Sequence, residues 1–334
     1  MRTANFAVLY MKPNLDEIRK PIEGELKIFE EKFRASMKTK TALLDAVMQY
    51  IVKQKGKKVR PMFVFLSASI CGEITDATYR GAALIELLHT ATLVHDDVVD
   101  DSDERRGFFS INALWKNKIA VLVGDYLLSK GLLLAVGNKD FRLLEIVSDA
   151  VKEMSEGELL QIEKTRKLNI TEEIYFEIIR QKTASLISSA CAVGASSSNA
   201  SEEIVSKMKL FGEKVGIAFQ IKDDLLDFGS DDTGKPHGVD LKEKKITLPL
   251  IFSLNNSLPA DRKRIINIIR NHNTDPKKVK EVISFIHKND GMKYAEEKMN
   301  LYRNEAMSLL NGFVENQSLK SLKDLVYYTT ERTK

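Results

Sequence analysis

Residues 82–99 read Ala-Ala-Leu-Ile-Glu-Leu-Leu-His-Thr-Ala-Thr-Leu-Val-His-Asp-Asp-Val-Val, an apolar stretch with two aspartates near its end. Leu84, Leu88, Ala91 and His95 recur at the three- and four-residue spacing that places side chains on one face of a helix. The stretch therefore predicts a long apolar helix that carries acidic residues at its C-terminal end.

The same periodicity recurs along the rest of the chain, at residues 119–136, 143–164, 172–195, 201–228 and 292–310. Alternating strand patterns are nearly absent, and 7 Pro and 17 Gly in 334 residues leave few positions that break a helix. We expect an all-α protein, a single-domain bundle of long helices over residues 1–334. Residues 1–15 are expected to be a loosely ordered N-terminal segment.

Composition narrows the possible functions. The net charge is +4, and Lys and Arg are spread along the chain, which gives no argument for a nucleic-acid partner. We expect no signal peptide and no membrane span, because no run of 18 uncharged apolar residues occurs. Cys71 and Cys191 form neither a disulfide framework nor a zinc pattern, and their apolar surroundings favour buried, inert thiols. A reducing cytoplasm is the expected location.

The first acidic cluster is formed by residues 95–101, His-Asp-Asp-Val-Val-Asp-Asp. Asp96 and Asp100 are four residues apart, so on a helix they lie one turn from each other on one face. Carboxylates at the C-terminal end of a helix are unfavourable for the helix dipole, and a divalent cation between them would compensate. Oxygen-only ligands favour magnesium, which completes its coordination with water and substrate phosphates. Alone, such a cluster could equally be a solvated helix end.

A second cluster, residues 220–227, reads Gln-Ile-Lys-Asp-Asp-Leu-Leu-Asp and repeats the four-residue spacing with Asp223 and Asp227. It also ends an apolar helical segment. Two such clusters facing each other would form a clamp of several metal ions around a diphosphate. The pair is a much stronger signal than either cluster alone.

Basic residues could bind phosphate beside these clusters. Lys57, Lys58 and Arg60 lie in a tight turn, Arg105 and Arg106 follow the first cluster, and an arginine can fork onto phosphate oxygens. The other candidates are Lys182 with Thr183 and the polar segment 229–245, which reads as a basic flap over the site. His89 could be a core residue or a metal ligand, but we favour a hydrogen-bond donor to phosphate. Each of these alone could be a solvated surface charge.

Five motifs in order resemble the trans-prenyltransferase (polyprenyl diphosphate synthase) family, from about residue 16 to the C-terminus. They are residues 56–61 (Gly-Lys-Lys-Val-Arg-Pro), 86–107 with the first cluster, 182–184 (Lys-Thr-Ala), 219–227 with the second cluster, and 234–249 with Lys-Ile-Thr-Leu-Pro at its end. The resemblance implies the isoprenoid synthase fold, with helices around a central cavity. It also implies head-to-tail condensation of isopentenyl diphosphate with an allylic diphosphate of the farnesyl or geranyl type.

The resemblance assigns roles to individual residues. About three magnesium ions per site would bridge the allylic diphosphate, with Asp96, Asp100 and Asp223 as ligands and with Asp97, Asp224 and Asp227 in support. The allylic diphosphate would be bound by Arg105, Lys182, Thr183, Gln220, Lys235 and Lys245. The diphosphate of isopentenyl diphosphate would be bound by Lys57, Arg60, His89 and Arg106. A homodimer is also implied, and a greasy product suggests contact with a membrane surface during release.

Three positions depart from the family pattern. Lys58 stands where Arg is usual, Lys55 where a second Gly is common, and Lys244 where Gly usually precedes Lys245. Because each change keeps or adds positive charge, we expect activity to be retained. The geometry of the loops near both substrates is expected to differ.

Product length is expected to depend on the residues one to two turns below the first cluster. In the family, large aromatic residues at the positions of Ala91 and Thr92 stop chain growth early, and the residues here are small, with Leu88 further down. We expect a long all-trans product of about C30 to C50, the length of quinone side chains. The tunnel floor could be Leu132, Leu133 or Leu134, and these cannot be separated from sequence.

Several alternatives remain at this point. A shorter-chain farnesyl or geranylgeranyl diphosphate synthase would share every motif except the chain-length residues. A class I terpene cyclase would replace the second cluster and needs no second diphosphate site, which Lys57, Arg60 and His89 argue against. A His-Asp metal phosphohydrolase would need more metal-binding histidines. A non-catalytic subunit of a heteromeric synthase usually lacks one acidic cluster, and both clusters are present here.

Overall fold

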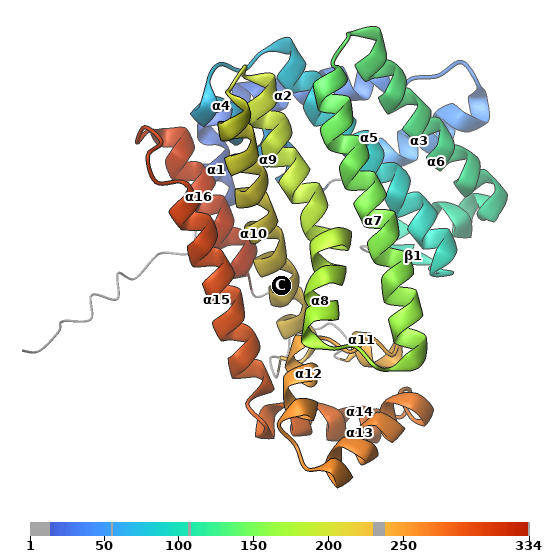
Figure 1. Ribbon diagram of the computed structural model, residues 1–334. Coiled ribbons are helices and arrows are strands. Elements are labelled where there is room, and N and C mark those ends of the chain that lie inside the picture. The colour runs from blue at the N-terminus through green and yellow to red at the C-terminus, as the bar shows by residue number, and fades with distance from the viewer. Residues whose placement is uncertain (1–13, 55, 106–107, 230–237, 333–334) are drawn as a thin grey trace, which may run out of the picture.

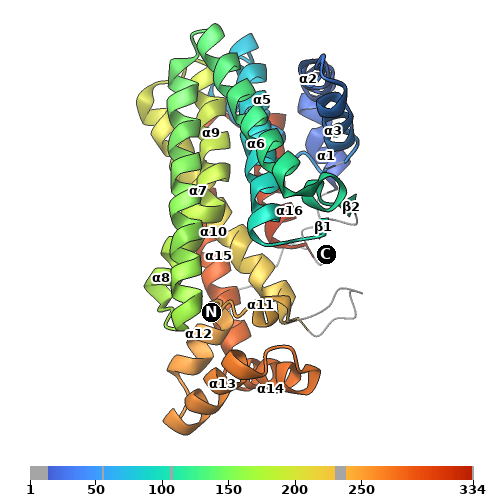
Figure 2. The ribbon, with the colours of Figure 1, turned by 90° about the vertical axis from the view of Figure 1, so that its right-hand side faces the viewer.

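The computed structural model describes residues 14–54, 56–105, 108–229 and 238–332, and helices make up most of it (Figure 1). The N-terminal elements form a layer on one side of the molecule (Figure 2). They are α1 (Leu15–Arg19), η1 (Lys20–Ile22), α2 (Glu23–Ser36) and α3 (Ala42–Lys53). Of the expected loose segment, residues 1–13 lie outside the described residues, and Leu15 already begins a helix.

The helices of the bundle follow. They are α4 (Val59–Cys71), α5 (Asp76–Val99), α6 (Ile111–Gly137), α7 (Phe141–Lys167), α8 (Glu172–Ile179), η2 (Arg180–Ala184), α9 (Ser185–Ser197) and α10 (Glu202–Asp227). Between α5 and α6, β1 (Glu104–Arg105) pairs antiparallel with β2 (Phe108–Phe109), and Glu104 lies opposite Phe109. In the described part of the chain this ribbon is the only sheet, so the expected all-α class is confirmed.

The remaining helices close the bundle at one end and along one side (Figure 1). They are α11 (Val239–Lys242), α12 (Leu248–Asn255), α13 (Pro259–Asn271), α14 (Pro276–Lys288), α15 (Gly291–Leu309) and α16 (Gln317–Thr330). Helices α13 and α14 form a cap beyond the lower end of the long helices, whereas α15 and α16 run back beside α10 (Figure 1).

Side-chain caps fix where the predicted helices begin. Helix α5 starts six residues before the periodic stretch, because Thr75 and Thr78 form a reciprocal capping box at its N-terminus. Ser110 and Ser201 cap α6 and α10 by accepting hydrogen bonds from backbone N–H groups in the first turn. Apart from the predicted helix 172–195, predicted and observed ranges therefore agree in the helix interiors and differ mainly at the ends.

Helix α9 lies at the centre of the bundle and is built almost entirely of small residues. Every residue from Ser185 to Ala195 is buried. A Cβ added at Gly194 would collide with the backbone of α4, and one added at Gly212 of α10 would lie 2.6 Å from the Ile187 carbonyl oxygen. The small side chains therefore let the backbones of α4, α9 and α10 approach closely, as dense helix packing requires.

The predicted helix 172–195 is interrupted by η2, one π-helical turn between α8 and α9. Two neighbouring helices approach this turn closely through glycines. A Cβ at Gly157 of α7 would lie 2.9 Å from the Lys182 backbone nitrogen, and one at Gly216 of α10 would clash with Ala184. Single π turns inside helices are frequent at functional sites, and this one carries Lys182 and Thr183.

Helix α6 is the one helix among the described residues whose length and composition would suffice to cross a membrane. It still carries Asp125 and Lys130, consistent with the lack of a long uncharged run. One face is buried against α5 through Ala120, Val123 and Leu127. The other side exposes apolar side chains, namely Leu114, Val121, Leu122, Leu132, Leu133 and Val136. Helix α6 is therefore a core helix of the bundle with one exposed apolar face.

Candidate active site

The first acidic cluster ends α5 as predicted. Asp97 points inward and is 4% exposed, Asp96 is half-buried, and Asp100 is exposed just past the helix end. The Asp97 carbonyl oxygen accepts hydrogen bonds from the Ser102 backbone at 2.9 Å and from the Asn112 side chain at 3.2 Å. These bonds tie the end of α5 to the start of α6, while Asp96 and Asp100 keep the more open positions.

The carboxylates of the second cluster make three different kinds of contact. Asp223 forms an ion pair with Arg332, which follows α16. Asp224 is 2% exposed and accepts hydrogen bonds from Tyr175 of α8 at 2.6 Å and from Gln220 at 2.9 Å. Asp227 accepts hydrogen bonds from backbone N–H groups of α11. Equal spacing in the sequence thus leads to unequal roles in the structure.

Burial governs the protonation of the groups at the centre of this cluster. Burial, together with the nearby charge of Asp240, raises the pKa of Asp224 well above its usual range. The hydrogen bonds from Tyr175 and Gln220 act in the opposite direction and lower this pKa. Asp240 is half-buried, and burial and the charge of Asp227 raise its pKa to about 7. The carboxylates here are therefore costly to ionise until positive charge approaches.

Asp227 anchors the chain where it returns to the site after residues 230–237. Its Oδ1 accepts from the Val239 backbone at 2.9 Å and its Oδ2 from the Asp240 backbone at 3.1 Å. The Gly238 backbone donates to the Asp227 carbonyl oxygen at 3.0 Å. The expected flap includes Gly234, Lys235 and Pro236, which lie outside the described residues, so this anchor defines only the end of the segment.

Lys245 lies beyond this anchor and pairs with Glu243 at 2.5 Å. Burial lowers the pKa of Lys245, but the ion pair and the charges of Asp240 and Asp100 outweigh burial and raise it above its usual value. Because Asp100 belongs to the first cluster, that cluster and Lys245 lie within electrostatic reach of each other. The negative charge of Asp223 likewise raises the pKa of Asp240, which connects the second cluster to the same region.

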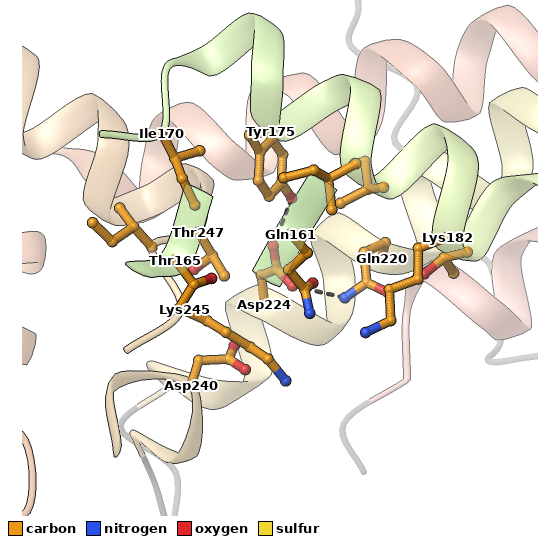
Figure 3. Close-up of a pocket in the computed structure, with 14 residues that line it drawn as sticks. Gln161, Thr165, Ile170, Tyr175, Lys182, Gln220, Asp224, Asp240, Lys245 and Thr247 are labelled. Atoms are coloured by element: carbon orange, nitrogen blue, oxygen red, sulfur yellow. Dashed lines mark hydrogen bonds between the residues drawn. The ribbon is translucent and has the colours of Figure 1, made fainter. Parts of the chain in front are cut away.

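A cavity of about 250 Å³ opens beside these groups (Figure 3). Its polar lining includes Lys182, Thr183, Gln220 and Lys245, four of the residues predicted to bind the allylic diphosphate. The Lys182 ammonium forms an ion pair with Glu158 of α7. The structure thus brings these four predicted residues together from η2, α10 and the segment after α11.

Two predicted residues of the allylic set cannot be placed in the same way. Lys235 lies outside the described residues. The backbone of Arg105 forms part of β1, and its side chain is likewise not described. Both remain predictions for the allylic diphosphate.

The residues predicted for isopentenyl diphosphate lie on α4, on α5 and just before α4. Arg60 in the first turn of α4 pairs with Glu86 at 2.8 Å, and His89 follows Glu86 by one helical turn on α5. Lys57 is exposed, and its ammonium lies 5.4 Å from the ring centre of Tyr328 of α16. These three residues therefore share one region, whereas Arg106 lies outside the described residues.

The C-terminal segment connects the two sides of the site, a contribution that the sequence did not reveal. Tyr328 touches the cation Lys57 on one side, and Arg332 pairs with Asp223 on the other. The guanidinium of Arg332 also lies over the Phe219 ring, 4.3 Å from its centre. Arg332 is 109 positions away from Asp223, so no local pattern could have indicated this pairing. Tyr175 and Glu158 were missed for the same reason.

Two departures from the family pattern coincide with unusual backbone. Lys58 and Lys244 both adopt the left-handed conformation, with φ of 54° and 59°. This conformation costs an ordinary residue roughly 1–2 kcal/mol and suits glycine. Lys244 stands where the family usually has Gly, and its ammonium donates to the Arg270 carbonyl oxygen at 3.0 Å. The loop therefore keeps the conformation that a glycine would favour.

Of the residues expected to control product length, Ala91 and Leu88 lie in the core and Thr92 is half-buried. Ala91 is fully buried, Leu88 is 3% exposed, and the Thr92 hydroxyl donates to the His89 carbonyl oxygen at 2.9 Å. Of the candidates for the tunnel floor, Leu132 and Leu133 are exposed on the outer face of α6, whereas Leu134 packs against the core. Leu134 is thus the one of the three that faces the interior.

The two cysteines match the expectation of unreactive thiols. Cys191 is fully buried and Cys71 partly so, and burial raises the pKa of both thiols to about 12. Neither takes part in the site.

Comparison with known proteins identifies the family. Residues 41–286 match the Polyprenyl synthetase family. Heptaprenyl diphosphate synthase component 2 of Geobacillus stearothermophilus is 33% identical over 315 residues, which cover 93% of this chain and 97% of that protein. A short chain isoprenyl diphosphate synthase of Methanothermobacter thermautotrophicus is 33% identical over 311 residues, which cover 91% and 95%.

Solved structures agree with this assignment. A decaprenyl diphosphate synthase from Rhodobacter capsulatus superposes with a TM-score of 0.91 at 32% identity, covering 96% of this chain and 100% of that one. A polyprenyl synthase from Caulobacter crescentus, complexed with calcium and isoprenyl diphosphate, gives 0.89 at 28% identity and covers 97% and 99%. The chain therefore belongs to the polyprenyl synthetase family and is a polyprenyl diphosphate synthase, a prenyltransferase. The family resemblance, fold and enzyme class expected from sequence are confirmed.

The site chemistry fits the divalent metal that the family uses, of which the calcium in the Caulobacter structure is an example. The available ligands are carboxylates, and Arg332 already places a positive charge beside Asp223. The described residues contain no group of three or more His, Cys, Asp or Glu side chains that could hold a metal together. A metal here would take its other ligands from water and substrate phosphates, as magnesium does.

Proposed function

We propose that the enzyme condenses isopentenyl diphosphate with an allylic diphosphate, of the farnesyl or geranyl type, to give a long all-trans polyprenyl diphosphate. The arrangement of the cations carries the proposal: Lys182 and Lys245 lie with Gln220 beside the second cluster, whereas Lys57 and Arg60 lie on α4 and the turn before it. Two separate cationic sets suit two diphosphates. A terpene cyclase or a phosphohydrolase has no use for the second set.

On the metal side, Asp96, Asp100 and Asp223 are proposed ligands of about three magnesium ions. Bound metal would draw charge onto the leaving diphosphate and lower the barrier to its departure. The proposed support from Asp224 and Asp227 is indirect, because their oxygens accept hydrogen bonds from protein groups. Asp97 supports the cluster through its backbone link to α6.

The allylic diphosphate is proposed to bind Lys182, Thr183, Gln220 and Lys245, with Arg105 and Lys235 completing the set. Lys182 would exchange its ion pair with Glu158 for a phosphate oxygen, and Lys245 would leave Glu243 in the same way. Isopentenyl diphosphate is proposed to bind Lys57, Arg60, His89 and Arg106. These residues hold the acceptor in place while the allylic bond breaks.

The chemistry follows from this placement. The C1–O bond of the allylic substrate breaks, and Lys182 and Lys245 stabilise the negative charge that develops on the departing diphosphate. The double bond of isopentenyl diphosphate attacks C1, a new carbon–carbon bond forms, and a proton leaves C2 of the acceptor. The departed diphosphate is the proposed proton acceptor. Exclusion of water from the cavity would keep the allylic cation from being quenched.

The product is proposed to be long, about C30 to C50. The small side chain of Ala91 beneath the first cluster supports this, as does the inward position of Leu134. A farnesyl or geranylgeranyl synthase remains the second candidate, because a relative named for short chains is as similar as one named for a heptaprenyl product.

One incubation tests the reaction: isopentenyl diphosphate, farnesyl diphosphate and Mg²⁺, followed by chromatography of the products. We expect a ladder that ends at a long polyprenyl diphosphate, together with inorganic diphosphate. A product that stops at geranylgeranyl length would support the second candidate. A cyclic hydrocarbon or simple hydrolysis would contradict the proposal.

A homodimer is proposed on the exposed apolar face of α6. Leu122 and Leu133 are 11 residues apart and so lie on one side of the helix, with exposed fractions of 56% and 73%. Contiguous exposed apolar surface of this kind commonly marks an interface. Light scattering on the purified chain should give twice the monomer mass, and Leu133→Lys should lower it. A monomer that gains activity only with a second protein would instead indicate a two-component enzyme.

The cell compartment and membrane contact are also proposals. The two free cysteines support a reducing cytoplasm. Release of an apolar product supports transient contact with a membrane surface, which co-sedimentation with lipid vesicles during turnover would test.

A further inference from the structure

Tyr175 begins a chain of hydrogen bonds along the wall of the cavity (Figure 3). It is 4% exposed, and its hydroxyl donates to Asp224 Oδ2 at 2.6 Å. Gln220 Nε2 donates to the other carboxylate oxygen, Oδ1, at 2.9 Å, and the Thr183 hydroxyl donates to Gln220 Oε1 at 2.8 Å. The chain links α8, α10 and the π turn η2, and its far end carries two proposed ligands of the allylic diphosphate.

The chemistry of the groups fixes the direction of this chain. Asp224 accepts one donor at each carboxyl oxygen, the Tyr175 hydroxyl at Oδ2 and Gln220 Nε2 at Oδ1. The amide nitrogen of Gln220 must therefore face Asp224, and its carbonyl oxygen must face Thr183. Buried networks of this kind specify one arrangement when every member is satisfied. Removing the Tyr175 hydroxyl would leave Asp224 Oδ2 buried without this donor and would free Asp224 and Gln220 to reorient.

We infer that Tyr175 is a positioning residue of the allylic diphosphate subsite, acting through Asp224 to set the orientation of Gln220 and Thr183. The inference deepens the proposed function and rests on it. It also assigns Asp224 a role that differs from that of Asp223. Asp224 orders protein ligands of the diphosphate, whereas Asp223 pairs with Arg332 and is a proposed metal ligand.

The competing explanation is that Tyr175 only fastens α8 to the bundle. Another tyrosine of the protein offers a matched control. The Tyr294 hydroxyl of α15 donates to Glu172 Oε1 at 2.7 Å, and Glu172 is the first residue of the same helix α8. Tyr294 does not line the cavity. Tyr175→Phe and Tyr294→Phe thus each remove one hydroxyl that donates to a carboxylate and connects α8 to a neighbour.

The test measures binding and kinetics in the full-length enzyme with Mg²⁺. Calorimetry with an unreactive, sulfur-bridged farnesyl diphosphate analogue gives the Kd at the allylic subsite. For Tyr175→Phe we expect the Kd of the analogue and the KM of the allylic substrate to rise about tenfold, the scale of one lost buried hydrogen bond. The KM of isopentenyl diphosphate should stay within about twofold, and Tyr294→Phe should change neither binding constant.

A second variant keeps the inference testable if Tyr175→Phe does not fold. Asp224→Asn retains the shape but offers hydrogens toward one of its donors, so it should raise the Kd of the analogue as well. In the double variant Tyr175→Phe/Asp224→Asn the two increases in Kd should not add, because both substitutions act through the same chain of hydrogen bonds. An unchanged Kd in Tyr175→Phe, or an equal rise in Tyr294→Phe, would overturn the inference. Wild-type enzyme that fails to bind the analogue would overturn the proposed function, and this inference with it.

Discussion

The two acidic clusters have the same spacing in the sequence but different surroundings in the structure. The first stands at the end of α5, where Asp96 and Asp100 keep open positions and only Asp97 turns inward. In the second, Asp223 pairs with Arg332, Asp224 is buried under two hydrogen bonds, and Asp227 holds α11. A repeated motif can thus leave carboxylates in open positions at one place and use them as hydrogen-bond and ion-pair acceptors at another.

The largest effect should come from removing one proposed metal ligand from each cluster. Asp96→Ala and Asp223→Ala should each reduce kcat about 100- to 1000-fold or more, because each loses charge stabilisation of the leaving diphosphate. Steady-state kinetics at saturating substrates measures this. Near-normal turnover in either variant would mean that its cluster is not a metal site. The variants should differ in stability, since only Asp223→Ala leaves Arg332 without its ion pair.

Of the two helices that carry the clusters, only that of the first cluster should affect product length. Ala91→Phe adds a ring to a fully buried position of α5, which should shorten the main product by several isoprene units. Overpacking should also lower stability by about 1–3 kcal/mol, so a melting curve accompanies the product chromatography. Unchanged chain length in a folded Ala91→Phe enzyme would show that the growing chain does not pass this residue.

A smaller effect is expected from Asp227, whose role should be anchoring. Asp227→Ala leaves the backbone N–H groups of Val239 and Asp240 without their acceptor, and kcat should fall about tenfold as Lys245 loses its position. Hydrogen exchange of the α11 amides should become faster at the same time. Asp227→Asn keeps one acceptor oxygen, so its kcat should lie between those of the wild-type enzyme and Asp227→Ala. A loss as large as that of Asp223→Ala, with α11 exchange unchanged, would instead indicate a metal ligand.

The smallest effect, on Mg²⁺ affinity, is expected from Arg332. This residue forms an ion pair with Asp223 of the second cluster. Arg332→Gln should let a divalent ion reach Asp223 without displacing this partner. The affinity for Mg²⁺ should rise about two- to fivefold, the scale of a partly exposed ion pair. Calorimetric titration with Mg²⁺ and inorganic diphosphate measures it. Weaker metal binding in the variant would show that Arg332 assists the metal.

The helical architecture was largely predictable because long helices bury periodic apolar faces. Residues 82–99 and 201–228 lie inside or nearly match α5 and α10, and errors fall at ends set by caps such as Thr75. The π turn was not predictable. The sequence 172–195 has continuous helical character, and the distortion depends on the close approach of Gly157 and Gly216 from other helices.

In the candidate site, too, local motifs were predictable and contacts between distant residues were not. Lys182, Thr183, Gln220 and Lys245 were found from motifs, and the structure brings them to one cavity. The partners of the second cluster were not found. The contact of Arg332 with Asp223 joins residues far apart in the chain, and such pairings depend on packing that local patterns do not encode. The family resemblance implied one supporting role for Asp224 and Asp227, whereas in the structure Asp224 accepts from Tyr175 and Gln220 and Asp227 accepts from the backbone of α11.

Helix α9 has a consequence for reading a saturation mutagenesis scan of this enzyme. Its residues are small because the backbones of α4 and α10 come so close, so nearly any larger side chain there should be rejected by the fold. The scan would show a strip of intolerance from Ser185 to Ala195 as severe as that at the aspartates. Soluble yield, measured beside activity, would tell the two apart: α9 variants should disappear from the soluble fraction, whereas aspartate variants should remain folded and inactive.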